Sequence, residues 1–314
     1  MSLDDSTTRR LDDPKVSVIM PVERIGGDAE RAIASVLQQK PPFAFELIVV
    51  SAEPLALAVE TRLRNVVEAN RNPATRRNRA VSVAQGEILA FIDDDAVADP
   101  GWLATACAYL DEHPDVLAVG GPDPAPPDSP VNELISDTLL ATPWIGSGVA
   151  AHENRRGVFD VKRASDIALV NLFVRRSAFT GFDEAIGYIG EDTALLEELR
   201  TRGRVVYHDG VRVFHRRRAF PGPYLRQRWR YRVKTGQLQR TRRDPRVTAF
   251  VAAGAIGLFL APLTAVPYAL LTFLLGVRVT RLPLRWWPVI PVAFAMHHLT
   301  YWMGIVTGLT SSRK

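Results

Sequence analysis

Apolar positions in the first two hundred residues form short continuous runs that alternate with runs of helical spacing. The continuous, β-branched runs predict buried strands at residues 16–20, 45–50, 65–68, 88–92 and 116–119. The runs with helical spacing predict helices at residues 28–39, 55–63, 75–84 and 101–112. Because strands and helices alternate with short connections, we expect an α/β fold with a mostly parallel sheet flanked by helices.

Polar side chains directly follow several of the predicted strands. Glu23 follows the first strand, Ser51 and Glu53 follow the second, and Asp93-Asp94-Asp95 follows the strand at 88–92. Ligands of such sheets bind beyond the carboxyl ends of the strands, so these residues are candidates for a site. The chain lacks a Gly-x-Gly-x-x-Gly after its first strand and a Gly-Lys-Ser/Thr loop, which weakens dinucleotide-binding and P-loop interpretations.

The three adjacent aspartates carry the clearest chemical signal. Carboxylates crowded at a strand end repel one another and lose hydration, so a cation is expected to compensate them. Mg²⁺ or Mn²⁺ suits this place, because both prefer oxygen ligands and keep positions open for phosphate oxygens. The alternative interpretation is an acidic, solvated turn.

A second acidic pair, Glu191-Asp192, follows Gly187 and Gly190 and begins a helical apolar stripe. Acidic residues in a first helical turn are favoured by the helix dipole, which would explain the pair without any function. The glycines favour another interpretation, in which the backbone brings a carboxylate close to a substrate.

The last third of the chain changes character. The 314 residues have a net charge of +5, arginines crowd residues 211–246, and residues 247–310 are mostly apolar. Because the basic residues gather directly before an apolar segment, we expect contact with anionic lipids and not with nucleic acid. The polar start of the chain is typical of a frayed tail and not of a signal peptide, and the single Cys107 excludes an internal disulfide.

Two uncharged stretches predict membrane insertion. Residues 288–310 have the length of one span, whereas residues 247–277, which contain Pro262 and Pro267, are longer than one span and shorter than two. The longer stretch is either one kinked helix or a re-entrant hairpin. We favour two crossings, with three as the alternative, and therefore expect a multi-pass protein. The arginine-rich residues before it predict an amphipathic helix lying on anionic lipid.

Several stretches resemble, in chain order, the family-2 glycosyltransferases, which have the GT-A fold. The similar stretches are Val16–Pro21, Glu46–Val50, Arg77-Asn78, Gly86–Asp95, Gly190–Leu196 and Val213–His215. They cover about residues 15–225. The resemblance implies that Asp93 and Asp95 form the Asp-x-Asp motif and hold Mg²⁺ or Mn²⁺ together with His215. It also implies that Asp192 is the general base and that Glu191 shapes the acceptor pocket.

The resemblance further implies a set of residues that bind the nucleotide sugar. They are Pro21, Val22, Glu23, Ser51, Glu53, Arg77, Asp93, Asp94, Arg228 and Trp229. Ser51-Ala52-Glu53 stands where the family often has two aspartates, so the base that is bound stays open. Arg228-Trp229 matches the end of the Gln-x-x-Arg-Trp motif of processive polysaccharide synthases, but Leu225 replaces the glutamine.

These features predict four parts: a tail at 1–14, a GT-A catalytic domain at 15–225, a basic interfacial segment at 226–246 and a transmembrane region at 247–314. By resemblance to bacterial enzymes of exopolysaccharide or lipid-linked glycan synthesis, we expect inverting, metal-dependent transfer from a nucleotide-diphosphate sugar. The acceptor would be a polyprenyl-linked glycan or lipid at the cytoplasmic membrane face. A processive polysaccharide synthase and a membrane-tethered nucleotide-binding protein without transferase activity are the alternatives.

Overall fold

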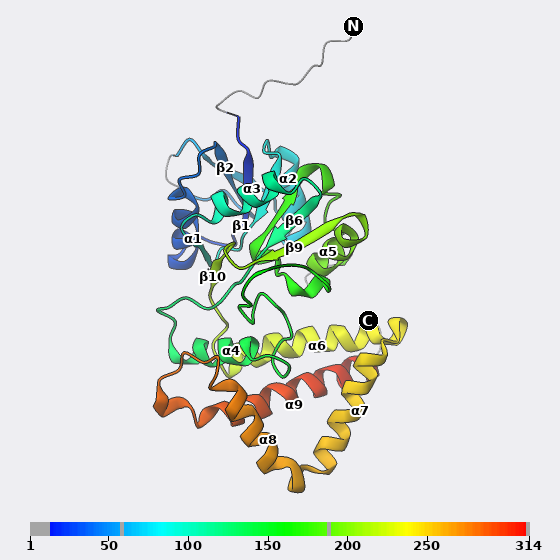
Figure 1. Ribbon diagram of the computed structural model, residues 1–314. Helices are drawn as coiled ribbons and strands as arrows, with labels where there is room; N and C mark the ends of the chain where they lie inside the picture. The colour runs from blue at the N-terminus through cyan, green and yellow to red at the C-terminus, as the bar shows by residue number, and fades with distance from the viewer. Residues whose placement is uncertain (1–12, 57–59, 187–189, 312–314) are drawn as a thin grey trace. The chain divides into compact units, whose positions relative to one another are not determined.

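The computed structural model describes residues 13–56, 60–186 and 190–311, and these fall into two compact units (Figure 1). The first unit contains the chain up to Asp123 and residues 154–215. The second unit contains residues 124–153 and the chain from Arg216 onwards. Residues 124–153, which the sequence analysis placed in the catalytic domain, therefore group with the C-terminal helices.

An eight-stranded sheet forms the centre of the first unit. Its strands lie in the order β3 (Leu63–Val67), β2 (Phe45–Ser51), β1 (Val16–Pro21), β4 (Ile88–Phe91), β8 (Leu172–Arg175), β6 (Val116–Gly120), β9 (Arg204–His208) and β7 (Val158–Asp160). The strands from β3 to β4 are parallel, as are β6 and β9, whereas β8 is antiparallel to both of its neighbours. The expected α/β fold is confirmed, with a sheet that is mixed because β8 and β7 run against their partners.

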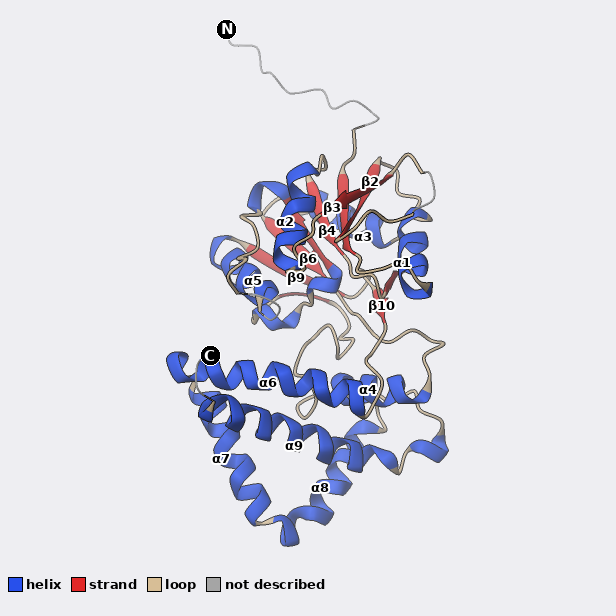
Figure 2. Cartoon of the chain, turned by 180° about the vertical axis from the view of Figure 1, so that it is seen from behind, coloured by secondary structure: helices blue, strands red, loops and turns tan. Residues whose placement is uncertain are grey.

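Helices flank this sheet (Figures 1 and 2). They are α1 (Gly27–Leu37), α2 (Pro73–Val83), α3 (Trp102–Glu112) and α5 (Glu191–Arg202), and the single-turn helices are η1 (Ala164–Asp166), η2 (Leu169–Asn171) and η3 (Arg176–Ala178). Asn72 caps α2 by accepting a hydrogen bond from the backbone N–H of Ala74, and Pro73 follows in the first turn. A small antiparallel ribbon joins β5 (Ala96–Ala98) to β10 (Val213–His215).

The helix predicted at residues 55–63 is wrong for the residues that the structure describes there. Leu55, Ala56 and residues 60–62 are not helical, and residues 57–59 lie outside the described part of the chain. Strand β3 begins at Leu63, earlier than predicted, because residues 63–67 pair in parallel with β2. Pairing with an existing sheet edge thus overrides the short run of helical spacing.

The second unit is helical. It contains α4 (Val131–Ala141), α6 (Gly222–Arg242), α7 (Pro245–Phe259), α8 (Ala261–Gly276), the short η4 (Leu284–Trp286) and α9 (Val289–Thr310). Helices α6 and α9 lie side by side along their length (Figures 1 and 2). Their backbones touch, since a β-carbon at Gly308 would lie 2.1 Å from the Val233 carbonyl oxygen and one at Gly236 2.2 Å from that of Ile305.

The long uncharged stretch forms two helices that bend by 112° at Leu260. Pro262, in the first turn of α8, has no N–H to continue the hydrogen bonds of α7, so the first helix ends at Phe259. In the described part of the chain α9 is long and apolar enough to cross a membrane, and α7 with α8 would add one broken span. These helices do not support the expected multi-pass arrangement.

Candidate functional site

The carboxyl ends of the parallel strands β1, β2 and β4 meet at one edge of the sheet. Pro21 lies opposite Val50, and Ile19 lies opposite Phe91, so the residues that follow these strands come together. The backbone N–H of Glu23 donates a hydrogen bond of 3.4 Å to Asp94 across this edge. The sheet register therefore explains why polar residues from distant parts of the sequence share one place.

Asp93, Asp95 and His215 form a cluster of possible metal ligands. One ligand atom from each lies within 4.8 Å of the others, and all three residues are half-buried. The β5–β10 ribbon creates this proximity, because His215 pairs with Ala96, the residue after Asp95. The Nε2 atom of His215 lies 3.2 Å from Oδ1 of Asp95.

Asp123 completes the cluster and was missed in the sequence analysis. Its fully buried carboxylate lies 3.3 Å from Nδ1 of His215. Gly121 makes this approach possible, since a β-carbon there would lie 2.0 Å from the Val211 carbonyl oxygen. Asp123 follows β6 by three residues, so the rule that polar residues after strands are candidates would have found it.

Asn171 holds the segment around Asp123 in place. Its side chain is fully buried and donates to the carbonyl oxygens of Pro122 at 3.1 Å and Val211 at 2.7 Å. Its oxygen accepts a hydrogen bond of 2.8 Å from the indole of Trp102. These bonds tie the loop after β6 to the segment before β10.

This donor set fits a divalent cation. Mn²⁺ readily binds both carboxylates and imidazole. Mg²⁺ prefers oxygen ligands and would bind mainly to the two carboxylates. Asp123 lies against one ring nitrogen of His215, so the other nitrogen faces Asp95. Such a carboxylate behind a histidine fixes the ring and its tautomer in many metal sites.

Arg77 links the aspartate run to the acidic pair on α5. The guanidinium is buried, donates to Oδ1 of Asp93 at 3.0 Å and donates to Oε1 of Glu191 at 3.2 Å. The preceding Arg76 donates to Glu23 at 2.8 Å. Helix α2 thus brings two consecutive arginines to the carboxyl edge of the sheet.

The negative charge at this edge exceeds what the arginines neutralise locally. Burial, and then the neighbouring Asp95 and Asp93, raise the pKa of Asp94 to about 6. Burial and the adjacent Asp192 also raise the pKa of Glu191, although Arg77 acts in the opposite direction. A bound cation would relieve this repulsion.

Asp192 lies in the first turn of α5, next to Glu191. The helix begins after Gly190, whose φ of 104° is strained for any residue with a side chain. Asp192 is half-buried, and its Oδ1 accepts a hydrogen bond of 2.6 Å from the Thr193 backbone N–H. Gly187, the other glycine of the predicted motif, lies outside the described residues.

The other predicted binding residues have varied surroundings. Ser51 is buried and donates to the carbonyl oxygen of Glu53 at 2.7 Å, whereas the Glu53 side chain is exposed. Val22 is buried, and its N–H donates to Val50 at 2.8 Å. Arg228 and Trp229 lie in α6 of the second unit, where the Arg228 guanidinium lies 5.4 Å from the ring centre of Tyr224.

Three known proteins are similar to parts or most of this chain. A solved mannosyltransferase, PcManGT from Pyrobaculum calidifontis in complex with GDP-Man and Mn²⁺, is 20% identical, with a TM-score of 0.52 over 92% of this chain and 87% of that one. TarS of S. aureus is 14% identical, with a TM-score of 0.46 over 93% and 90%. A glucosyl-dolichyl phosphate glucuronosyltransferase of Haloferax volcanii is 38% identical over 52 residues, which are 17% of each chain.

The family comparison covers more of the chain. The sequence model of glycosyl transferase family 2 matches residues 17–179, a region from β1 to the residue after η3. This region contains Asp93, Asp95 and Arg77, and the fold around it is that of the GT-A enzymes. The chain therefore belongs to glycosyl transferase family 2 and is a glycosyltransferase with a GT-A fold.

Proposed function

We propose that this enzyme transfers a sugar from a nucleotide-diphosphate sugar to a lipid-linked or glycan acceptor, in a metal-dependent reaction that inverts the anomeric configuration. The observation that carries the proposal is the cluster of Asp93, Asp95 and His215, joined through Arg77 to the acidic pair of α5. This arrangement offers ligands for a cation and a base within one connected set of side chains.

Donor binding is assigned to the carboxyl edge of the sheet. Asp93, Asp95 and His215 would hold Mn²⁺ or Mg²⁺, which supplies charge neutralisation for a departing diphosphate. The similar mannosyltransferase was solved with GDP-Man and Mn²⁺, which supports a nucleotide-sugar donor and a cation here. Glu23, Asp94 and Ser51 follow neighbouring strands and are the candidates for contacts to the nucleoside.

Asp192 is the proposed general base. Its carboxylate accepts the proton of the acceptor hydroxyl while the hydroxyl oxygen forms a bond to the anomeric carbon. The bond from that carbon to the diphosphate breaks on the opposite face, and the pair of electrons leaves with the diphosphate. Arg77 donates a hydrogen bond to Glu191, so we assign the base role to the neighbouring carboxylate of the pair, Asp192. A single displacement of this kind inverts the configuration.

Two independent observations support a lipid-linked acceptor, which we place at the cytoplasmic membrane face. The second unit contains the long apolar helix α9. A short segment of the chain also matches an enzyme whose name includes glucosyl-dolichyl phosphate. An acceptor carried by a lipid would require a site close to the bilayer, and anionic lipids would attract the basic residues of α6.

Calorimetry with a panel of nucleoside diphosphates tests the donor site. One diphosphate should bind in the presence of Mn²⁺ and lose at least about 100-fold in affinity when the cation is chelated or when Asp95 is replaced by alanine. The matched control is Asp111→Asn, a change on the exposed surface of α3 of the same unit. Tight binding that ignores both Mn²⁺ and the Asp95→Ala change would reject the metal-dependent reaction.

A further inference from the structure

The second unit exposes a large apolar surface at the junction of α7 and α8. Phe259 is 85% exposed, Leu263 78% and Val266 79%. These residues lie at the point of the V that α7 and α8 form, which projects away from α6 within this unit (Figures 1 and 2). A contiguous apolar surface of this kind marks a place where something apolar binds.

Helix α9 also has an exposed apolar stripe. Val292, Met296, Leu299 and Met303 are between 38% and 60% exposed and follow one another at helical spacing. Another side of α9 packs against α6, where Gly304 and Gly308 allow close contact with the α6 backbone. The helix therefore has one side covered by protein and one apolar side open.

Both arms of the V are attached to α9. The indole of Trp302 donates to the Val251 carbonyl oxygen of α7 at 2.8 Å. The hydroxyl of Tyr268, in α8, lies 2.8 Å from Nδ1 of His298. The V and α9 thus form one structure, with α7 near the C-terminal part of α9 and α8 near its N-terminal part.

The charges of α6 exclude a position across the bilayer for this helix pair. Helix α6 contains Arg226, Arg228, Arg230, Arg232, Lys234 and Arg240. Charged side chains are costly in the hydrocarbon core, and α9 touches α6 from Tyr224 opposite His297 to Arg240, which donates to Ser311. If α9 crossed the membrane in this arrangement, the charged side chains of α6 would also lie in the hydrocarbon core.

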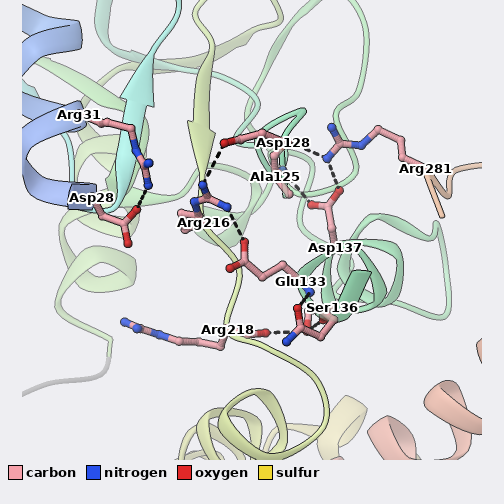
Figure 3. Close-up of polar contacts among 11 residues, drawn as sticks. Asp28, Arg31, Ala125, Asp128, Glu133, Ser136, Asp137, Arg216, Arg218 and Arg281 are labelled. Atoms are coloured by element: carbon pink, nitrogen blue, oxygen red, sulfur yellow. Dashed lines mark hydrogen bonds and ion pairs between the residues drawn. The ribbon is translucent and has the colours of Figure 1, made fainter. Parts of the chain in front are cut away.

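The segment that follows the V returns to a charged cluster near the start of α6. Asp137 of α4 accepts a hydrogen bond of 3.0 Å from Arg217, which precedes α6. It accepts another of 3.0 Å from Arg281, which follows α8 (Figure 3). Arg281 also donates to the Ala125 carbonyl oxygen at 2.7 Å. Because one buried carboxylate holds both arginines, residues 217 and 281 lie on the same side of the apolar surface.

We propose that the enzyme is monotopic: the V of α7 and α8 enters one leaflet of an anionic bilayer and returns, while α9 lies in the interface. Each arm of about 23 Å is shorter than the roughly 30 Å hydrocarbon core, and the bent pair reaches about 20 Å, enough for one leaflet. Arg278 and Arg285, both exposed beside the V, contact lipid headgroups together with the basic side chains of α6. This inference replaces the multi-pass expectation and does not depend on which sugar is transferred.

Cysteine labelling tests this topology without any activity measurement. Cys107 is the single cysteine and is buried, so a Cys107→Ala background can carry single cysteines at Ser82 in the first unit, at Arg285 and at Ser311. Proteoliposomes are treated with a membrane-impermeant maleimide before and after detergent. The labelled fraction before detergent should be the same at all three positions.

Each other labelling pattern overturns the proposal in a recognisable way. If Arg285→Cys alone is protected when Ser82→Cys is labelled, the stretch from α7 to α8 crosses the membrane once and α9 crosses back. If Ser311→Cys alone is protected, α9 crosses. A second measurement keeps the test independent of labelling chemistry.

That measurement is sedimentation with vesicles of three parts phosphatidylcholine and one part phosphatidylglycerol. The double change Phe259→Asp and Leu263→Asp should lower the vesicle-bound fraction at least tenfold, whereas Val158→Asp, at an exposed apolar residue of the first unit, should not. A protein that sediments equally with and without the double change contradicts the proposal. A dimer that the double change converts to a monomer would also contradict the proposal, because the apolar surface would then be covered by a second copy of the chain.

Discussion

The two units of this chain differ in where they expose apolar side chains and where they concentrate charged ones. Among the large apolar residues that the structure describes as exposed, Val67 and Val158 belong to the first unit and the others to the second. The first unit instead concentrates charge at the carboxyl edge of its sheet, where four carboxylates gather around Arg77 and His215. This contrast agrees with the two proposals, a charged nucleotide-sugar donor for the first unit and a bilayer for the second.

The buried charges of the two units also differ in how they are compensated. In the second unit Asp137 has two arginines and a backbone N–H as partners, so its charge is satisfied by the protein. In the first unit Asp93, Asp94 and Asp95 are adjacent, and burial, followed by repulsion from Asp95 and Asp93, raises the pKa of Asp94. A carboxylate between two arginines has its charge balanced by the protein, whereas a run of adjacent carboxylates favours binding of a cation.

The largest effect is expected at the acidic edge, from Asp192→Asn. An amide cannot take the acceptor proton, so we expect kcat to fall by roughly 10³-fold while binding of the nucleoside diphosphate is retained. Single-turnover transfer with a labelled donor and calorimetry measure the two quantities. The control is Glu197→Gln, an exposed carboxylate on the same helix. Unchanged turnover in Asp192→Asn would assign the base to another residue.

The next effect concerns the satisfied cluster of the second unit. Asp137→Asn leaves two arginines beside a neutral amide in a buried place, so we expect the free energy of unfolding to fall by about 3 kcal/mol. Thermal unfolding in detergent checks this. Asp128→Asn removes an exposed partner of Arg216 and should cost less than about 0.5 kcal/mol. If both variants lost the same free energy of unfolding, the ion pairs of Asp137 would contribute no more to stability than those of a surface carboxylate.

A smaller effect is expected from changing Asp123, which contacts the proposed metal ligand His215. Asp123→Asn keeps the shape of the side chain but removes the charge that faces His215, so Mn²⁺ should bind about tenfold more weakly. Titration of Mn²⁺ followed by electron paramagnetic resonance measures this affinity, with Asp111→Asn as the control from the same unit. An affinity equal to that of the unchanged protein would remove Asp123 from the site.

Much of the first unit could be predicted from the sequence because its strands are continuous apolar runs. The strands at residues 16–20, 45–50 and 88–92 were predicted within one residue at each end, since buried parallel strands need uninterrupted apolar side chains. Strand β8 was not placed in the sheet, because its antiparallel position between β4 and β6 depends on partners distant in sequence.

Glu23, Ser51 and Asp93–Asp95 became candidates for the site because they directly follow predicted strands. His215 and Asp192 became candidates through the resemblance to the family, and the roles of all these residues stay predictions. Asp123, three residues after β6, was missed although the same rule applies to it, but its approach to His215 depends on the backbone contact at Gly121. Arg77 was expected to bind the nucleotide sugar, and that role stays a prediction, but nothing in the sequence indicated that it would join Asp93 to Glu191.

The sequence by itself determined which residues must avoid water and which carry charge. It therefore established the α/β unit, the acidic run after β4, the resemblance to its family and the apolar, arginine-flanked end of the chain. Only the tertiary structure decided which other distant groups lie together: Asp123 with His215, and Arg217 with Arg281 through Asp137. The physical reason is that hydropathy is a property of each residue, whereas the pairing of charges and the direction of a helix after a bend depend on contacts between segments.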